Sequence, residues 1–400
     1  MFYKTCAGRG LPGAVAACRE RVTVTVDLFS DTQTRPTPGM REAMARAEVG
    51  DEQSGSDPTT NALCARVADL LGMEDAVFMP SGTMCNLAAI LVQTRAGDEI
   101  IVDDQSHIYN TEAAGAAAIG GVSVRPLPTR NGLYTPEQAE AAIRTPQRTA
   151  PRSALISIEQ TTSFSGGSIW DLGTMRAIRD IARDRGLKAH IDGARLLNAV
   201  AATGIPARAY AEGFDSAWID LSKGLGCPVG AVLCGTKAFV TEAWRWKYRL
   251  GGAMRQSGVL AAAGLYALDH HLDQLAEDNA NARRLREGLE GAPGLAFEPE
   301  AGQSNILSFS VAGLDVPAAV FAEACLAHGV RIRAIGEQIR ATTHLDVDCA
   351  GIARAVAVIR AQADAFARTR DSEGTSPFGG VSGRSPDGHF QGSALDPRKG

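Results

Sequence analysis

Short apolar runs alternate with helical patterns between residues 76 and 235, and this alternation constrains the fold more than any other feature. The apolar runs have the length of buried strands, and amphipathic helical patterns separate several of them. Strands that alternate with helices form a largely parallel sheet. The sequence therefore predicts an α/β domain. The predicted strands are residues 76–79, 99–102, 154–158, 189–192, 216–221 and 231–234.

Composition narrows the classes of protein that need to be considered. The 400 residues are enough for one large and one smaller domain. The net charge of −5 gives no reason to expect nucleic acid or a membrane surface as a partner. No apolar run approaches the roughly 18 residues of a membrane span. We therefore expect a protein that acts on a small molecule.

The eight cysteines are scattered, without a C-x-x-C pair. This pattern argues against a zinc cluster or a disulfide framework and predicts reduced thiols in the cytoplasm, with no metal site.

Changes in sequence character predict the domain boundaries. Residues 26–268 form the large domain, and residues 269–368 form a small C-terminal α+β domain of short strands and two clear helices. Residues 369–400 are rich in Ser, Gly, Pro and Asp and are expected to be a disordered tail.

The first 25 residues are expected to be a disordered extension, or to follow from a start codon assigned too early. The run 11–17 faintly resembles a lipoprotein signal, but Pro12 and Gly13 interrupt it.

Lys223 lies between a strand pattern and a glycine-rich turn, among small and apolar residues. Desolvation lowers the pKa of an amine and favours its neutral, nucleophilic form. Such a lysine can form a Schiff base with an aldehyde cofactor.

Three further features complete a chemical set. The turn Ser81-Gly82-Thr83 joins a strand to a helix, which suits either a phosphate or an ordinary helix cap. Asp192 ends a strand 31 residues before Lys223. His107 follows another strand, where ligands bind in open α/β sheets, although a lone histidine is more often structural. Pyridoxal 5′-phosphate needs a phosphate anchor, a carboxylate at its ring nitrogen and a lysine at its aldehyde, so the set predicts this cofactor.

Seven motifs extend this reading across most of the chain, and their order resembles that of low-specificity L-threonine aldolases. These enzymes belong to the β-eliminating lyase group of fold-type I pyridoxal phosphate enzymes. The resemblance implies a large domain with a mostly parallel seven-stranded sheet, a small C-terminal domain, and a homodimer or homotetramer. The motifs cover residues 27–32, 55–59, 81–86, 192–195, 222–226, 254–258 and 343–347.

The resemblance also implies roles for the matching residues. Lys223 would carry the internal aldimine, Asp192 would pair with the pyridinium nitrogen, and His107 would stack on the ring and help proton transfer. The remaining cofactor contacts would come from Ser81, Gly82 and Thr83 at the phosphate, from Arg195, and from Arg255 of a neighbouring subunit. The substrate carboxylate would be bound by Ser30, Arg195 and Arg340, with Thr162 near the substrate side chain.

The sequence departs from the family pattern near the substrate. Thr162 stands where a histidine is common, Ser54 where a tyrosine is frequent, Phe29 where arginine is usual and Ser56 where aspartate is usual. Threonine is a poor general base, so water or His107 would have to serve.

The expected reaction is retro-aldol cleavage of L-threonine, L-allo-threonine or a related β-hydroxy-α-amino acid to glycine and an aldehyde. The first alternative is another reaction at the same cofactor, either amino-acid racemisation or β-elimination in a biosynthetic pathway. The second is a binding or regulatory protein that keeps only the fold.

Overall fold

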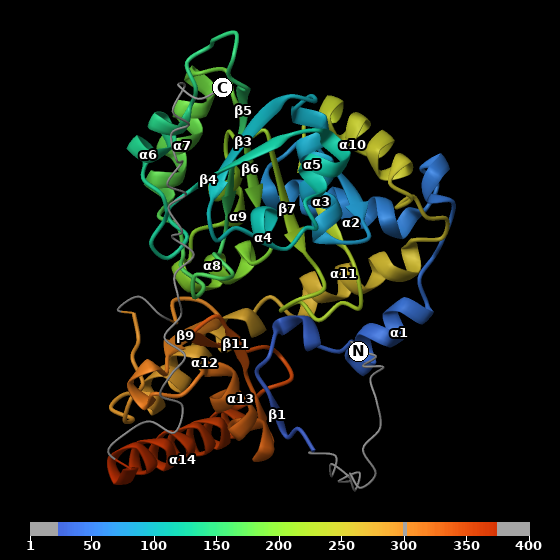
Figure 1. Ribbon diagram of the computed structural model, residues 1–400. Helices are drawn as coiled ribbons and strands as arrows, with labels where there is room; N and C mark the ends of the chain where they lie inside the picture. The colour runs from blue at the N-terminus through green and yellow to red at the C-terminus, as the bar shows by residue number, and fades with distance from the viewer. Residues whose placement is uncertain (1–22, 299–301, 374–400) are drawn as a thin grey trace, which may run out of the picture.

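A computed structural model describes residues 23–298 and 302–373 of the chain (Figure 1). Its larger domain is built on a seven-stranded sheet in which only the two pairings made by β8 are antiparallel. The predicted α/β class with a mostly parallel sheet is therefore confirmed. In sheet order the strands are β2 Asp75–Met79, β8 Ala231–Gly235, β7 Ser216–Asp220, β6 Lys188–Asp192, β5 Arg152–Glu159, β3 Asp98–Asp103 and β4 Ser123–Leu127.

Both faces of this sheet are buried. Because successive side chains of a strand point to opposite faces, Ala217 and Ile219 of β7 join one core cluster and Trp218 joins another. Helices cover each face. The first cluster includes residues of α2 Pro58–Leu71, α7 Leu172–Asp184 and α11 Gly258–His270, and the second includes residues of α3 Gly82–Gln93 and α10 Lys237–Arg249.

One predicted helix is interrupted. The pattern over residues 111–118 predicts a single helix, whereas the structure has α4 His107–Asn110 and α5 Gly115–Gly120. Between them Ala113 and Ala114 have positive φ angles of 51° and 55°. The interruption allows Glu112 to turn inward and bond with buried polar groups. Other helices of this domain are α1 Pro38–Ala45, α6 Pro136–Ala142, α8 Leu196–Thr203 and α9 Ala207–Ala211.

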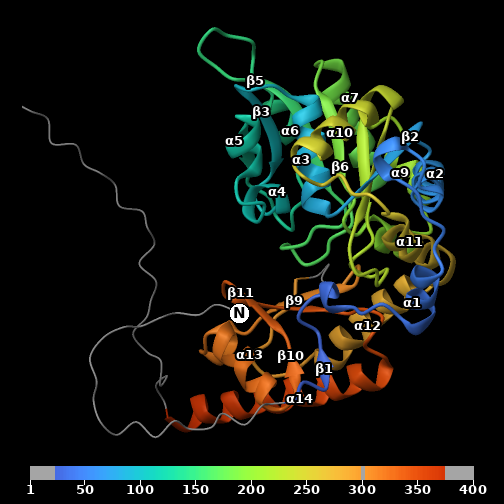
Figure 2. The same cartoon turned by 90° about the vertical axis from the view of Figure 1, so that its right-hand side faces the viewer.

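The smaller domain carries a three-stranded antiparallel sheet between its helices and the large domain (Figure 2). Leu307, Phe309 and Ile339 point away from the large domain into a separate hydrophobic core. The opposite face of the sheet is turned toward the large domain. The elements are β9 Ile306–Ser310, β12 Gln338–Thr342 and β11 Arg333–Ile335, with α12 Gln274–Leu289, α13 Ala318–Ala327 and α14 Cys349–Glu373.

The first strand belongs physically to the small domain. β1 Val26–Asp27 pairs in parallel with β10 Val330–Arg331, and Val26 and Leu28 pack into the small-domain core. The expected boundary placed these residues in the large domain, because the sequence shows no sign of this long-range pairing. The division near residue 268 otherwise stays a prediction.

The expected extension and tail fall largely outside the described residues, which begin at 23 and end at 373. In the described part of the chain, no helix is both long and apolar enough to cross a membrane.

A buried ion pair fastens α10 to the loop before α2. Lys247 and Glu52 are in contact and both are buried, and the Lys247 ammonium lies 4.4 Å from the centroid of the Trp244 ring. Glu52 also accepts the backbone N–H of Met254 at 2.7 Å. Burial lowers the pKa of Lys247, and Glu52 opposes that shift.

We expect Lys247→Met to lower the free energy of unfolding by about 3–5 kcal/mol, because it leaves the Glu52 carboxylate buried without its cation. Glu52→Gln combined with Lys247→Met should recover most of this loss, since the amide can still accept from Met254. Urea unfolding at fixed protein concentration measures both. A double variant no more stable than the single variant would contradict the interpretation.

Candidate active site

Acidic residues end four neighbouring strands of the large sheet and gather at one edge. Asp103, Glu159, Asp192 and Asp220 are the last residues of β3, β5, β6 and β7. Ligands bind outside the carboxyl ends of parallel strands in open α/β sheets. A cavity of about 370 Å³ lies there, and three of the four acids line it, together with residues of the small-domain sheet.

Lys223 enters this cavity from the turn after β7. Its Nζ lies 2.7 Å from Asp220 Oδ2 and 5.7 Å from the centroid of the Trp218 ring. The Thr34 hydroxyl donates to the Lys223 carbonyl at 2.9 Å, which holds the turn in place. The sequence predicted apolar surroundings for Lys223. The structure differs, because the amine pairs with the carboxylate of Asp220 at the end of β7.

Asp192 is held by the side-chain amide of Asn86. The Asn86 nitrogen donates at 2.7 Å to Asp192 and at 2.7 Å to Glu112. Its oxygen accepts from Trp218 at 2.7 Å and is 3.2 Å from the Nε2 atom of His190. All the hydrogen-bonding capacity of the amide is thus used, so its orientation is fixed. Asp192 is buried and has one preferred position.

His107 begins α4 and has a fixed ring orientation. Its Nδ1 lies 2.8 Å from Oε1 of Glu112, and its backbone N–H donates to Glu159 at 2.8 Å. Because Glu112 Oε1 also accepts from Asn86, we assign the Nδ1 proton to His107. That tautomer leaves Nε2 as the ring nitrogen available to a ligand. Burial raises the pKa of Glu112.

The N-terminus of α3 opens onto the same cavity. Gly82 and Thr83 line it, and the N–H groups of a helix's first turn have no partner within the helix. The Ser81 hydroxyl instead accepts the N–H of Met84 at 3.2 Å, so it serves the cap. A Cβ atom on Gly82 would come within 2.3 Å of the Trp218 ring, which explains the glycine.

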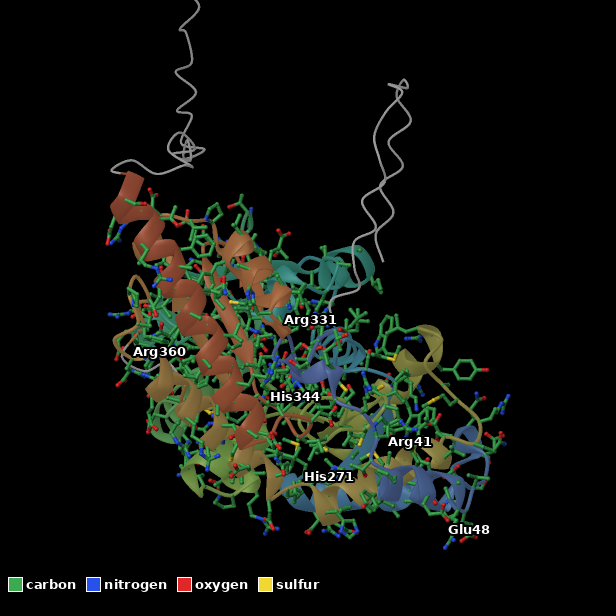
Figure 3. The ribbon with its side chains drawn as sticks, turned by 90° about the horizontal axis from the view of Figure 1, so that it is seen from below. Arg41, Glu48, His271, Arg331, His344 and Arg360 are labelled. Carbon is green, nitrogen blue, oxygen red and sulfur yellow. The ribbon has the colours of Figure 1, made fainter. Side chains whose placement is uncertain are left out.

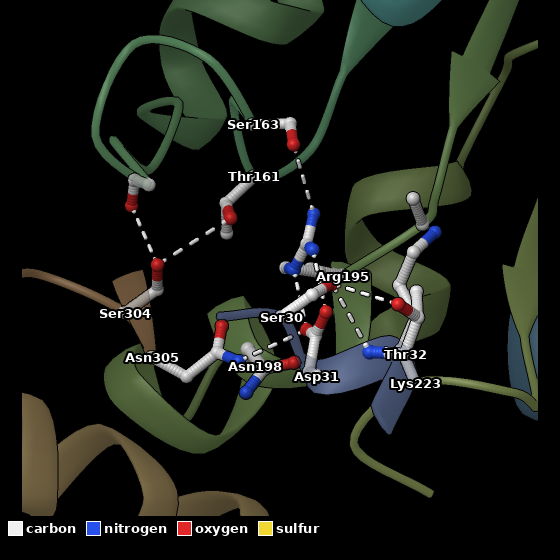
Figure 4. A network of polar contacts seen from close by, with 12 residues as sticks. Ser30, Asp31, Thr32, Thr161, Ser163, Arg195, Asn198, Lys223, Ser304 and Asn305 are labelled. Atoms are coloured by element: carbon white, nitrogen blue, oxygen red, sulfur yellow. Dashed lines mark hydrogen bonds and ion pairs between the residues drawn. The ribbon is translucent and has the colours of Figure 1, made fainter. Parts of the chain in front are cut away.

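Arg195 forms a buried bidentate ion pair with Asp31 (Figure 4). Its Nε and second terminal nitrogen each lie 2.7 Å from an Asp31 oxygen, and its other terminal nitrogen lies 3.3 Å from the Ser163 hydroxyl. Asn305 donates to Asp31 at 3.1 Å. Although burial opposes ionisation, the Arg195 guanidinium holds the pKa of Asp31 well below its usual range. Most of the Arg195 donors are therefore already used.

Arg340 differs because its donors are largely free. It is 3% exposed, and its Nε has no hydrogen-bond partner. One terminal nitrogen makes long contacts of 3.3 and 3.4 Å with Ser163. Burial and the nearby charge of Arg195 lower the pKa of Arg340 to about 10. Ser30 lines the same cavity, and its hydroxyl oxygen accepts from the Thr32 hydroxyl at 2.9 Å.

Three predicted residues do not line this cavity. Ser81 serves as the helix cap. Thr162 is buried, and its hydroxyl accepts the Ser168 N–H at 3.0 Å. Arg255 lies elsewhere on the molecule, where it pairs with Asp51 at 2.9 Å. The contribution of Arg255 to a neighbouring subunit stays a prediction.

Sequence reasoning also missed several residues of the site. Glu159 and Asp220 could have been predicted from the sequence, because each is an acidic residue at the end of a strand pattern. The contacts of Asn86 with Asp192 and of Asp31 with Arg195 had no such signal, since they join residues far apart in the chain. Further residues that were not predicted also line the cavity, among them Phe164 and Arg333.

The chemistry of this donor set fits pyridoxal 5′-phosphate. The cavity offers a primary amine at Lys223, a fixed buried carboxylate at Asp192, an imidazole at His107 and a helix N-terminus suited to a phosphate group.

Comparisons with known proteins agree with this assignment. The model of the β-eliminating lyase family matches residues 27–312. The low specificity L-threonine aldolase of Escherichia coli K12 is 39% identical over 84% of this chain and 98% of that protein. A probable low-specificity L-threonine aldolase of Arabidopsis thaliana is 43% identical over 71% and 81%. The Leishmania major threonine aldolase structure is similar with a TM-score of 0.74 at 21% identity, covering 84% of this chain and 99% of that one.

The acid that ends β3 provides a test of these electrostatics. Burial raises the pKa of Asp103 to about 7, above its unfolded value of about 3.9. The folded state therefore binds more protons between these values, so this group lowers stability as pH rises from about 4 to about 7.

We expect Asp103→Asn to be more stable than the wild type above pH 7, by an amount on the order of a few kcal/mol. Its amide oxygen can still accept the Gln105 N–H. The difference should grow from about pH 4 to pH 7 and then level off in denaturant unfolding. A difference that did not vary with pH would refute the assignment.

Proposed function

Because the chain belongs to the β-eliminating lyase family, we propose that it is a pyridoxal 5′-phosphate-dependent aldolase. It cleaves L-threonine, L-allo-threonine or a related β-hydroxy-α-amino acid to glycine and an aldehyde. The observation that carries this proposal is the convergence of Lys223, Asp192, His107 and Arg340 on one cavity.

Each cofactor contact has a residue suited to it. Pyridoxal 5′-phosphate supplies an aldehyde and an electron-withdrawing pyridinium ring. Lys223 binds the aldehyde, and Asp192 holds the proton on the ring nitrogen. The N–H groups of Gly82 and Thr83 receive the phosphate.

Arg340 is the main anchor for the substrate carboxylate. Its unpartnered Nε and nearly free terminal nitrogens suit a bidentate contact. Ser30 can add a hydroxyl contact. Arg195 contributes less, because Asp31 occupies two of its nitrogens. A fixed carboxylate orients the substrate and so decides which bond at Cα breaks.

His107 is the proposed general base at the β-hydroxyl. Cleavage requires loss of the hydroxyl proton while the Cα–Cβ bond breaks, and Cα must then gain a proton. Nε2 of His107 is free to accept, directly or through water, because Nδ1 is bound to Glu112. Thr162 is unsuited to this role, since its hydroxyl is buried and bonded to Ser168.

We also propose a homodimer or homotetramer in the cytoplasm. Arg255 does not line the cavity that holds Lys223. Its backbone carbonyl accepts the Glu52 N–H at 2.8 Å. The family resemblance and the absence of Arg255 from the lining of this cavity are the grounds for proposing that Arg255 reaches the phosphate in a second copy. Six cysteines in the described part of the chain are free thiols, which supports a reducing compartment.

We expect Lys223→Ala to lower the rate of glycine formation from L-threonine by at least about 10³-fold, because Lys223 is the only lysine among the described residues that line the cavity. The visible absorbance of the lysine-bound cofactor should disappear as well. Lys237→Ala is the matched control, since Lys237 is exposed at the start of α10, and it should change neither measurement.

A panel of threonine, allo-threonine and phenylserine, with glycine and aldehyde as products, tests the reaction itself. No glycine from any of them would reject the proposal. Racemisation of alanine, or pyruvate from serine, would indicate the alternative chemistry. If the protein supplied with pyridoxal 5′-phosphate showed no visible absorbance band, it would be a binding or regulatory protein that keeps only the fold.

A further inference from the structure

Two arginines face each other across the small-domain sheet. Arg333 of β11 and Arg340 of β12 are register partners in an antiparallel pair, so their side chains lie on the same face. Both line the cavity that holds Lys223. Like charges directly opposite each other destabilise a sheet. The pair therefore has a cost that a bound anion would remove.

Neither arginine has an acidic partner in the described part of the chain. The other cations nearby are neutralised, because Arg195 pairs with Asp31 and Lys223 pairs with Asp220. The positive charge of Arg333 is one of the influences that lower the pKa of Arg340. One substrate carboxylate can compensate Arg340, and the charge of Arg333 then remains.

Phe29 holds Arg333 in place. The guanidinium carbon of Arg333 lies 5.4 Å from the centroid of the Phe29 ring. Arg331 lies against the same ring at 4.2 Å, but its guanidinium pairs with Asp27 at 3.0 Å and it does not line the cavity. Figure 3 labels Arg331 in the view from below. Of these two arginines, only Arg333 is available to a ligand in the cavity.

We propose that Arg333 selects β-hydroxy-α-amino acids whose side chain carries a second carboxylate. The inference rests on the proposed aldolase function and deepens it. Arg340 binds the α-carboxylate, and Arg333 binds the carboxylate on Cβ. Neighbouring residues of paired strands have Cβ atoms about 5 Å apart, which suits two carboxylates separated by two carbons.

For 3-hydroxyaspartate the reaction balances without a further reactant. The Cα–Cβ bond breaks, the β-hydroxyl loses its proton, and its oxygen forms the carbonyl of glyoxylate. The electron pair of the broken bond remains on Cα, which takes up a proton to give glycine. The methyl group of threonine, in contrast, leaves the charge of Arg333 uncompensated.

The test compares kcat/KM of the holoenzyme for 3-hydroxyaspartate and for L-threonine, each as both Cβ diastereomers. We expect the better diastereomer of 3-hydroxyaspartate to be favoured about 10- to 100-fold, the range of one charge-assisted hydrogen bond. Arg333→Gln should reduce this ratio by a similar factor, and Arg333→Lys should retain part of it. Arg331→Gln removes the same charge beside the same ring and should leave the ratio unchanged.

A binding measurement separates recognition from turnover. In calorimetry with the holoenzyme, succinate should bind more tightly than propionate, and Arg333→Gln should abolish that difference. Glycine from threonine without preference for the diacid, or a preference that survives Arg333→Gln, would overturn this inference alone. Absence of glycine from every substrate would reject the aldolase function, and this inference with it.

Discussion

The ion pair between Asp31 and Arg195 is the contact on which the arrangement of the site depends. It joins the N-terminal segment to the loop after β6, and Asn305, which immediately precedes β9, binds the same carboxylate. Desolvating two charges is costly unless they are paired and hydrogen-bonded, and here both carboxylate oxygens are satisfied. The pair thereby fixes the small-domain sheet above Lys223. It also uses the donors of Arg195, so Arg340 is left to meet an anion.

The many acids at the sheet edge are distinguished by their surroundings. Burial and the nearby acids Asp192 and Asp103 raise the pKa of Glu159 well above its usual range, and burial raises that of Glu112. The Asn86 side chain donates to both Asp192 and Glu112 and so holds these two acids in place. The surroundings therefore separate Glu159 and Glu112, whose pKa values rise, from Asp31, whose pKa the Arg195 guanidinium holds low.

Local patterns in the sequence predicted most of the large domain, because strand runs and amphipathic helical patterns are set by residues that are close together in the chain. The edge strand β4 Ser123–Leu127 was not singled out, since only Leu127 is buried and its pattern is weak. In the site, the family resemblance grouped Lys223, Asp192 and Arg340. All three line one cavity, and their roles stay predictions. Tertiary contacts decide which side chains already have partners, and the sequence does not show these contacts. For this reason Thr162 was predicted at the substrate, although its hydroxyl is bonded to Ser168, and the unpaired charge of Arg333 was not predicted.

The pairing of β1 with β10 has a consequence for the order in which the chain can fold. Val26 pairs with Val330, so the small domain needs both the beginning and the end of the described chain. During synthesis the large-domain sheet is complete once β8 Ala231–Gly235 has left the ribosome, about a hundred residues before β10 Val330–Arg331 does. The strand β1 therefore has no pairing partner until β10 has been synthesised. Contacts between residues so far apart in the sequence slow folding, and an unpaired strand edge can associate with other chains. We expect a chaperone that assists this protein to act while β1 is still unpaired.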